Sequence, residues 1–298
     1  MAGNGSTFTL SASANGTGTN VVQAEWFEGA DPGLGKGNQF VFTSAPTVSL
    51  LSAPINYVVL NWTPGNHTLT LRVKDAANNW SNTASVVVNV VYPNNVFADE
   101  FESGDFSAWS VTGGTPSQIS VTSGAAQAGT YKMQAQIASG TSGYAQDNTP
   151  FTDASYHARF YFNPNGYTTG NGGNPPAVTI FSGLNAANAT VFQVQYRRST
   201  NTGYQVRLGV TRAGGTTFTS YYAITNNAWN AIEIDWSSAS SALVRFYTAG
   251  VLRQTLTGLN TSASVLDTVR LGPQGTLPNT GTVYFDSLVS TRRTLIGP

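Results

Sequence analysis

Apolar and polar residues alternate in short runs along almost the whole chain. In residues 67–74, for example, Leu69, Leu71 and Val73 alternate with polar side chains, a pattern typical of a strand with one buried face and one face in water. Gly, Asn, Pro and Ser separate such runs at intervals of roughly 8–15 residues. The sequence has no stretch with the period of an amphipathic helix. This pattern predicts an all-β protein.

The predicted strands fall into two groups. Seven short strands lie within residues 1–92, which fits a β-sandwich of the immunoglobulin-like type. Residues 93–96 are expected to be a linker, because Pro and Asn interrupt the pattern there. Residues 97–298 hold about a dozen longer strands, enough for a larger two-sheet antiparallel jelly roll. Within this second group, Thr248-Ala249-Gly250 predicts a tight hairpin.

Composition excludes several classes of protein. Charged residues make up 9% of the chain, and 14 basic residues balance 14 acidic ones, so we expect no nucleic-acid partner. No apolar run reaches the roughly 18 residues of a membrane span, so we expect no membrane insertion. Cysteine is absent, which removes disulfides, thiolate metal sites and cysteine nucleophiles. The 40% hydrophobic content is enough to build cores and argues against disorder.

The first group of strands carries a resemblance to a known class of module. The residues concerned are 24–28 (Ala-Glu-Trp-Phe-Glu), 31–37 (Asp-Pro-Gly-Leu-Gly-Lys-Gly), 65–69 and 72–81. They resemble the immunoglobulin-like accessory modules of secreted multidomain bacterial proteins. The resemblance implies a spacer or adaptor, and an extracellular or cell-surface location. Residues 1–7 have no signal-peptide character, so the expected location depends on the resemblance alone.

A second resemblance lies at the two ends of the longer group. It is carried by Phe101-Glu102-Ser103-Gly104-Asp105-Phe106-Ser107-Ala108-Trp109 and by Val283-Tyr284-Phe285-Asp286-Ser287-Leu288-Val289. The two segments are similar to the opening and closing strands of laminin-G-like, concanavalin-like and carbohydrate-binding jelly rolls. The resemblance implies that the first and last strands lie side by side, and that a structural calcium ion binds there.

Four acids at these ends are the candidate calcium ligands. Asp99, Glu102 and Asp105 crowd a short stretch of a chain with only 14 acids, and Asp286 is expected to return to the same edge. Converging carboxylates repel one another unless a cation or protons neutralise them, and Ca²⁺ binds 6–8 oxygens. The resemblance favours Glu102 and Asp286. The alternative is that these acids are solvated strand ends.

A pair of carboxylates raises the question of catalysis. Glu233 and Asp235 point to the same face of their predicted strand, an arrangement similar to that of laminarinase-type glucanases. Those enzymes need a further Glu two or three residues on, where this chain has Ser237 and Ser238. No hydrolase, phosphate-loop or dinucleotide motif is present. We therefore predict that the protein is not an enzyme.

A polar face of the second group is the candidate binding site. Planar amides and Arg side chains can bind sugar hydroxyls, and an aromatic ring can pack on the apolar face of a sugar. We expect a non-catalytic binding or adhesion protein for a glycan or cell-surface polymer. The predicted ligand-binding residues, expected on one sheet, are Tyr161, Arg159, Gln193, Gln195, Arg207, Glu233, Asp235 and Trp229.

Two alternatives to this binding site stay open. The same residues could form an ordinary solvated sheet face. The protein could also be a structural subunit that self-associates into a surface layer or filament, because low charge and exposed strand edges favour association.

Overall fold

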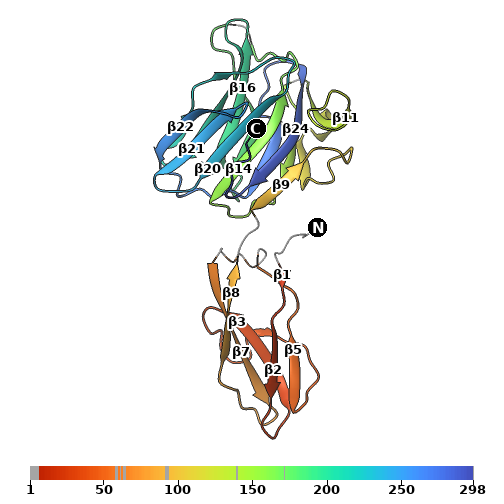
Figure 1. Cartoon of the computed structure of the whole chain (residues 1–298), viewed down its shortest axis with the longest axis vertical. Helices are drawn as coiled ribbons and strands as arrows, with labels where there is room; N and C mark the ends of the chain where they lie inside the picture. The colour runs from red at the N-terminus through yellow and green to blue at the C-terminus, as the bar shows by residue number, and fades with distance from the viewer. Residues whose placement is uncertain are drawn as a thin grey trace. The chain divides into compact units, whose positions relative to one another are not determined.

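The structure is a computed structural model of the chain, and it describes residues 7–57, 60, 62, 65–90, 94–138, 140–170 and 172–297. The chain divides into two compact units, residues 1–93 and residues 94–298 (Figure 1). Strands dominate both units, and the one helical turn in the described part is the 3₁₀ segment Pro116–Gln118. The all-β prediction is confirmed. Across the described residues, no helix has the length and apolarity that crossing a membrane would require.

The first unit contains three small antiparallel sheets. Its strands are β1 (Thr7–Phe8), β2 (Ser11–Asn15), β3 (Val21–Glu28), β4 (Asn38–Gln39), β5 (Thr47–Leu51), β6 (Ile55–Asn56), β7 (Gly65–Asp75) and β8 (Ala84–Val90). The largest sheet has the order β4-β3-β7-β8, and β1 pairs with β6 and β2 with β5. The buried core of the first unit includes Trp26, Leu50 and Leu69. The immunoglobulin-like assignment of this unit stays a prediction.

One polar residue of β7 is buried instead of facing water. Arg72 is 4% exposed, because its Nε donates to Glu25 Oε1 at 2.6 Å and its Nη atoms donate to Asp31. Glu25 is fully buried and also accepts hydrogen bonds from the N–H groups of Gly35 and Gly37. Burial alone would raise the pKa of Glu25, but the bonds from Arg72 and the two glycines outweigh it and lower this pKa. This ion pair ties the loop that carries the two glycines to the sheet.

We expect Glu25→Gln to destabilise the first unit by about 3–5 kcal/mol, because Arg72 loses its buried partner. The folded pKa of Glu25 lies below the unfolded value of 4.5. Its stabilising contribution is therefore present above that value and is lost as the pH falls through the folded pKa. Hydrogen exchange of β3 and β7, corrected for intrinsic rates, measures both effects. Glu28→Gln on the same strand should cost less than about 1 kcal/mol, and equal protection in the two variants would contradict the prediction.

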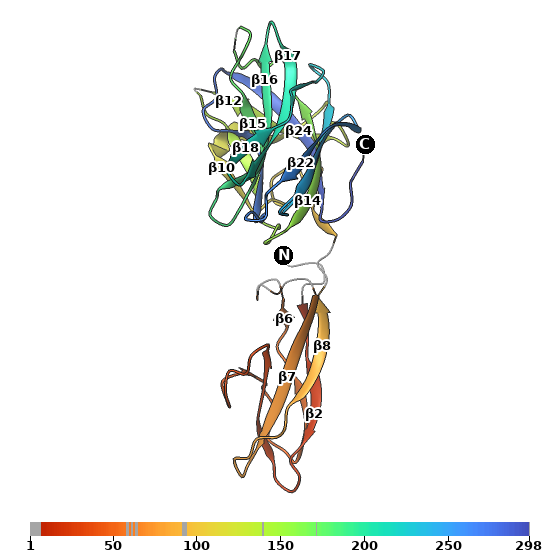
Figure 2. The same cartoon turned by 90° about the vertical axis from the view of Figure 1, so that its left-hand side faces the viewer.

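The second unit is a sandwich of two large antiparallel sheets (Figure 2). In spatial order, the sheet that we call the front sheet contains β10 (Val111–Gly114), β13 (Gly143–Asp147), β23 (Thr268–Gln274), β15 (Val178–Leu184), β16 (Thr190–Ser199), β17 (Gly203–Arg212) and β18 (Gly215–Phe218), with β19 (Tyr222–Ala223) also beside β17. The back sheet contains β11 (Ile119–Ser123), β12 (Tyr131–Ile137), β24 (Gly281–Thr291), β14 (Ser155–Asn163), β20 (Asn230–Ser237), β21 (Ala242–Thr248) and β22 (Val251–Leu259), with β9 (Asn95–Asp99) beside β24. The predicted hairpin joins β21 to β22, with both Ala249 and Gly250 at positive φ.

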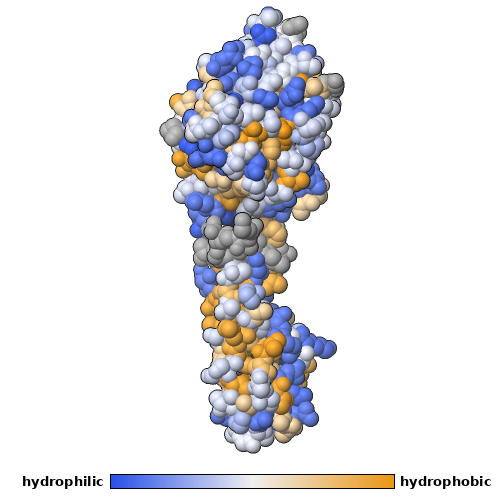
Figure 3. Space-filling view, turned by 90° about the vertical axis from the view of Figure 1, so that its right-hand side faces the viewer, coloured by the Kyte–Doolittle hydropathy of each residue, from blue (hydrophilic) through white to orange (hydrophobic). Residues whose placement is uncertain are grey.

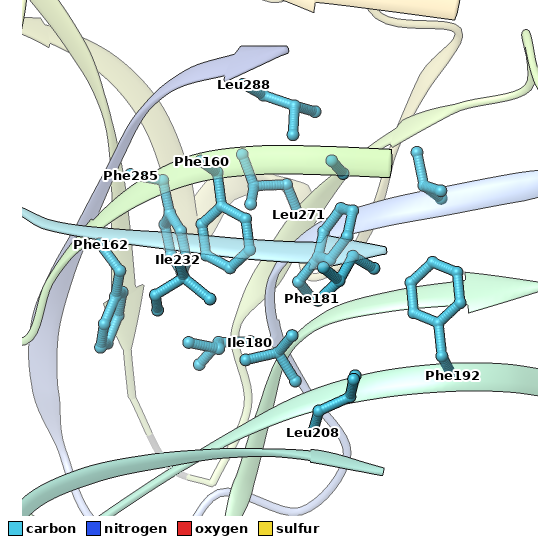
Figure 4. Close-up of a cluster of buried hydrophobic side chains, with 14 of the residues drawn as sticks. Phe160, Phe162, Ile180, Phe181, Phe192, Leu208, Ile232, Leu271, Phe285 and Leu288 are labelled. Atoms are coloured by element: carbon cyan, nitrogen blue, oxygen red, sulfur yellow. The ribbon is translucent and has the colours of Figure 1, made fainter. Parts of the chain in front are cut away.

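Aromatic side chains from both sheets fill the space between them (Figure 4). Phe160 and Phe285 come from the back sheet and Phe181 and Phe192 from the front sheet, and all four are fully buried. The rings of Phe160 and Phe181 meet across the interface with their centroids 5.0 Å apart. Because neighbouring residues of a strand face opposite ways, these inward positions determine which residues face outward.

The first and last strands of this unit lie side by side, as predicted. β9 pairs antiparallel with β24, with Val289 opposite Ala98. β9 begins at Asn95, so the second half of the segment expected to be a linker is strand. Beyond the pairing, the N–H of Arg292 donates to the carbonyl of Asn94 at 2.7 Å. The start of the second unit therefore lies beside the end of its last strand.

Candidate functional site: the arginine face

The predicted ligand-binding residues do not form the single face that we expected. The front sheet carries Gln193 and Gln195 on β16 and Arg207 on β17. The back sheet carries the others that lie in strands, which are Arg159 and Tyr161 on β14 and Glu233 and Asp235 on β20. The chain builds β15 to β19 in the front sheet between β14 and β20. The alternation of residues gives the face of a strand but not the sheet to which that strand belongs.

The outer face of the back sheet is covered by the end of the chain. Glu233 is 3% exposed, because its Oε1 accepts hydrogen bonds from the N–H groups of Ile296 (2.7 Å) and Gly297 (3.2 Å). Arg159 donates from Nη1 to the carbonyl of Gly297 at 2.7 Å. The segment 292–297 therefore occupies the place where a ligand of Glu233 and Arg159 would have to bind.

The remaining predicted residues of the back sheet also have partners within the chain. Asp235 Oδ2 lies 2.6 Å from Arg245 Nη1, as expected for an ordinary sheet face. Trp229 precedes β20, is half-buried, and donates from its indole N–H to the carbonyl of Ala125. This half of the predicted site has the character of a structural network.

The outer face of the front sheet is partly exposed and is lined with polar and aromatic side chains. Paired positions on adjacent strands face the same way, so rows of side chains cross the sheet. One row passes from β13 to β17 through Gln146, Arg270, Ser182, Gln193 and Gly209. We call this surface the arginine face and define it by Tyr144, Gln146, Gln193, Gln195, Arg197, Gln205, Arg207, Phe218, Tyr221 and Arg270.

Three cross-strand pairs on the arginine face share one arrangement. In each, an arginine donates from Nε to the side-chain oxygen of the glutamine that is its register partner on the next strand. The pairs are Arg197 with Gln205 (3.0 Å), Arg207 with Gln195 (2.8 Å) and Arg270 with Gln146 (2.7 Å). Because glutamine is neutral, each bond fixes a guanidinium group without cancelling its charge.

Aromatic rings hold the same guanidinium groups by cation–π contact. The distances from arginine Cζ to the ring centroid are 3.5 Å for Arg197 on Tyr221, 3.9 Å for Arg207 on Phe218, 4.5 Å for Arg207 on Tyr221 and 4.8 Å for Arg270 on Tyr144. Two of these rings, Phe218 and Tyr144, pack directly over glycines that have no side chain to clash with them. A Cβ atom at Gly209 would lie 2.5 Å from Phe218 Cε1, and one at Gly113 would lie 2.6 Å from the Tyr144 ring.

The arginine face as defined above contains no acidic residue. Asp147 is the one Asp or Glu in the strands of the front sheet, and it is buried and hydrogen-bonded to Thr149. Elsewhere in the described chain, three arginines lie 2.6 Å from a carboxylate oxygen. Arg197, Arg207 and Arg270 form no such ion pair with any described residue.

Sequence reasoning found part of this site. It selected Gln193, Gln195 and Arg207 from strand alternation, but it missed the ring of Tyr221 and the whole contribution of β13 and β23. A signal was available, because residues 154–232 contain no Asp or Glu while they contain five arginines. Such a stretch predicts a surface whose positive charge is not neutralised locally.

The four predicted calcium ligands do not form one cluster. Asp99 accepts hydrogen bonds from the N–H of Phe101 and the indole of Trp109, and Asp105 accepts from the N–H of Ser107. Within the described ranges, no group of three or more His, Asp or Glu residues could hold a metal ion.

Glu102 and Asp286 lie on two sides of the same loop. Glu102 Oε1 accepts from the N–H groups of Thr130 and Tyr131, each at 2.8 Å, and Asp286 Oδ2 accepts from the N–H of Gln127 at 2.7 Å. Burial raises the pKa of Asp286, although these hydrogen bonds act against the increase. Glu102 Oε2 and Asp286 Oδ1 are the other carboxylate oxygens, and Asp286 Oδ1 accepts from the hydroxyl group of Ser287 at 3.3 Å. Carboxylate oxygens and carbonyl groups are the ligand type that Ca²⁺ prefers.

Comparisons with known proteins show a shared fold over about two thirds of the chain. No protein-family model and no curated protein sequence matches the chain. Among solved structures, the chain is similar to the alginate lyase Aly36B in complex with an alginate tetrasaccharide, with a TM-score of 0.50 and 11% identity over 69% of this chain and 99% of that one. The cellulose-induced protein Cip1 gives a TM-score of 0.48 at 15% identity over 68% and 99% of the two chains. The receptor-binding domain of botulinum neurotoxin type G gives 0.44 at 12% identity over 68% and 48%. At these identities, the lyase shows a shared two-sheet fold and nothing more.

We expect Gly209→Ala to displace the Phe218 ring from the sheet, because the new Cβ would come within 2.5 Å of it. The cost should be about 1–3 kcal/mol of stability, as for other overpacked sites. Aromatic NMR shifts of Phe218 and thermal unfolding measure the change. Gly173→Ala is the matched control, because a Cβ there meets no atom within 4 Å. An unshifted Phe218 ring in Gly209→Ala would contradict this account of the face.

Proposed function

We propose that the arginine face binds a glycan and that the protein is a non-catalytic binding or adhesion module acting outside the cell or on its surface. The observation that carries this proposal is the set of three arginines, each held by a neutral glutamine and an aromatic ring on a partly exposed sheet face. Their side chains are positioned in advance, so binding costs little side-chain entropy.

The chemistry of the face suits a saccharide. Gln193 and Gln195 present amide groups, which both donate to and accept from hydroxyl groups. Phe218, Tyr221 and Tyr144 present rings on which the apolar face of a sugar can pack. The fold that the chain shares with an alginate lyase solved with a tetrasaccharide adds support. Because that neighbour is an enzyme, turnover of the bound glycan must be assayed alongside binding.

We expect Tyr221→Ala to weaken glycan binding by about tenfold or more, because it removes a stacking surface and the ring shared by Arg197 and Arg207. Tyr161→Ala, on the covered back sheet, is the matched control and should bind as the unchanged protein does. A glycan panel identifies the ligand, and titration calorimetry then compares the variants. Equal loss in both variants, or none in either, would contradict the assignment of the face.

We further propose a structural calcium ion held by Glu102 and Asp286 near the paired ends of the second unit. This proposal is supported by the hydrogen bonds of both carboxylates to the N–H groups of one loop and, for Glu102, by a surface hollow that Asp99 and Glu100 also line. The ion would cross-link the loop to β9 and β24 and would take no part in ligand binding.

Calcium at 100 times its dissociation constant should raise the melting temperature by about 5 °C or more, because only the folded state binds it. The increase should disappear in Glu102→Gln and persist in Glu28→Gln, which changes an exposed acid of the first unit. Differential scanning calorimetry with calcium and with chelator measures it. An identical melting temperature with calcium and with chelator would contradict the proposed calcium site.

Self-association stays a second prediction, and the first unit offers the surface that favours it most. β8 is an edge strand of its sheet, and Val86 and Val87 on it are 45% and 59% exposed. Other exposed apolar residues of this unit include Val41 and Leu51, and apolar patches are visible in the lower part of Figure 3. Unpaired edges with apolar side chains favour contact with another chain.

A further inference from the structure

The three arginines of the arginine face have no carboxylate partner among the described residues. The whole chain has a formal net charge of zero, so a general attraction to polyanions is not expected. The charge is instead concentrated locally, because the strands of the front sheet contain five arginines, three of them on the arginine face, and a single acid, the buried Asp147. Binding a neutral sugar would not require arginines that lack a nearby carboxylate.

The guanidinium groups also keep donors free. Each uses Nε for its glutamine partner, which leaves the terminal Nη atoms for other acceptors. Arg197 and Arg270 give one terminal nitrogen each to the side-chain oxygens of Asn174 and Asn188, both neutral. Arg207 uses neither terminal nitrogen on any described residue. A paired, planar set of N–H donors matches the two oxygens of a carboxylate or sulfate.

Arg207 is held in an environment that is unfavourable for its charge. Burial lowers the pKa of the Arg207 guanidinium, and the nearby charge of Arg197 acts in the same direction. The two guanidinium groups lie on one ring, that of Tyr221. An anion that contacts both groups would relieve both effects, since it neutralises two like charges at once.

The charges are spread too widely for one small anion. Arg270 is on β23, and β15 and β16 separate that strand from β17, which carries Arg207. At about 4.8 Å between neighbouring strands, the two arginines are roughly 14 Å apart across the sheet. A ligand that satisfies all three must carry anionic groups at intervals along an extended chain.

We propose that the ligand of the arginine face is an acidic polysaccharide, whose carboxylate or sulfate groups bind Arg197, Arg207 and Arg270. This inference rests on the proposed glycan-binding function and specifies the class of ligand. The glutamines and aromatic rings contact the sugar units, and the arginines select the charge.

The test compares a polyuronate with its carboxyl-reduced counterpart, which keeps the polymer backbone but loses the charge. Titration calorimetry on the full chain should give at least tenfold tighter binding of polygalacturonate than of the reduced polymer. Dextran sulfate, measured against dextran, distinguishes a sulfate ligand from a carboxylate ligand. Affinity for the acidic polymer should decrease as salt is raised, because partly exposed charges are screened.

Substitutions of the three arginines test whether they cause the preference for the acidic polymer. Arg197→Gln, Arg207→Gln and Arg270→Gln should each lower affinity for the acidic polymer roughly tenfold, the loss of one charge-assisted contact. Arg207→Lys should retain part of the affinity, because it keeps the charge and loses the paired donors. Arg253→Gln, on β22 of the back sheet, removes the same charge and should bind normally. Melting temperatures show that each variant is folded.

The outcomes separate this inference from the function on which it rests. Equal affinity for the polyuronate and its reduced counterpart would overturn the acidic ligand and leave glycan binding in place. No binding of any acidic or neutral glycan would overturn both. Single-stranded DNA bound as tightly as the acidic polymers, with the same dependence on the three arginines, would show a general polyanion site and overturn the polysaccharide.

Discussion

The packing of two large sheets on a shared aromatic core is the constraint on which the second unit depends. Phe192 is fully buried between the sheets, so Gln193 beside it must face outward. In the same way, the buried Val206 and Leu208 direct Arg207 to the outer face. A slip of one residue in either strand would exchange the two sets and bury a charge. The core therefore stabilises the fold and sets the positions of the surface groups together.

Neutral partners give the arginine face its character. When an arginine pairs with a carboxylate, its charge is neutralised, as the charge of Arg72 is by Glu25 in the first unit. Glutamine fixes the position of the guanidinium group equally well but leaves its field intact. The protein thus uses two modes of arginine pairing, one that ties a loop to a sheet and one that keeps a surface ready for an anion.

The sequence predicted strands and their faces well, and sheet membership poorly. Residues 97–298 hold the longer strands that alternation predicts, such as Gly203–Arg212 and Tyr131–Ile137, because burial of every second side chain is a local property. The separation of Arg159 from Gln193 is not local, since it depends on which strands pair across long stretches of chain. The covering of Glu233 by residues 296–297 has no sequence pattern at all, because it uses main-chain N–H groups. Arg72 appeared to be solvated for a related reason, as its partner Asp31 lies in a loop.

The 2.7 Å hydrogen bond from the N–H of Arg292 to the carbonyl of Asn94 holds the start of the second unit beside the end of its last strand. A domain whose first and last strands end side by side can be spliced into a surface loop of an unrelated host without stretching either protein. It can also be circularly permuted, with a short peptide closing the old ends and new ones opened at the Ala249-Gly250 turn. A transplanted domain of this kind would keep the front sheet intact, because every strand of that sheet lies between Asn94 and Arg292 in the sequence.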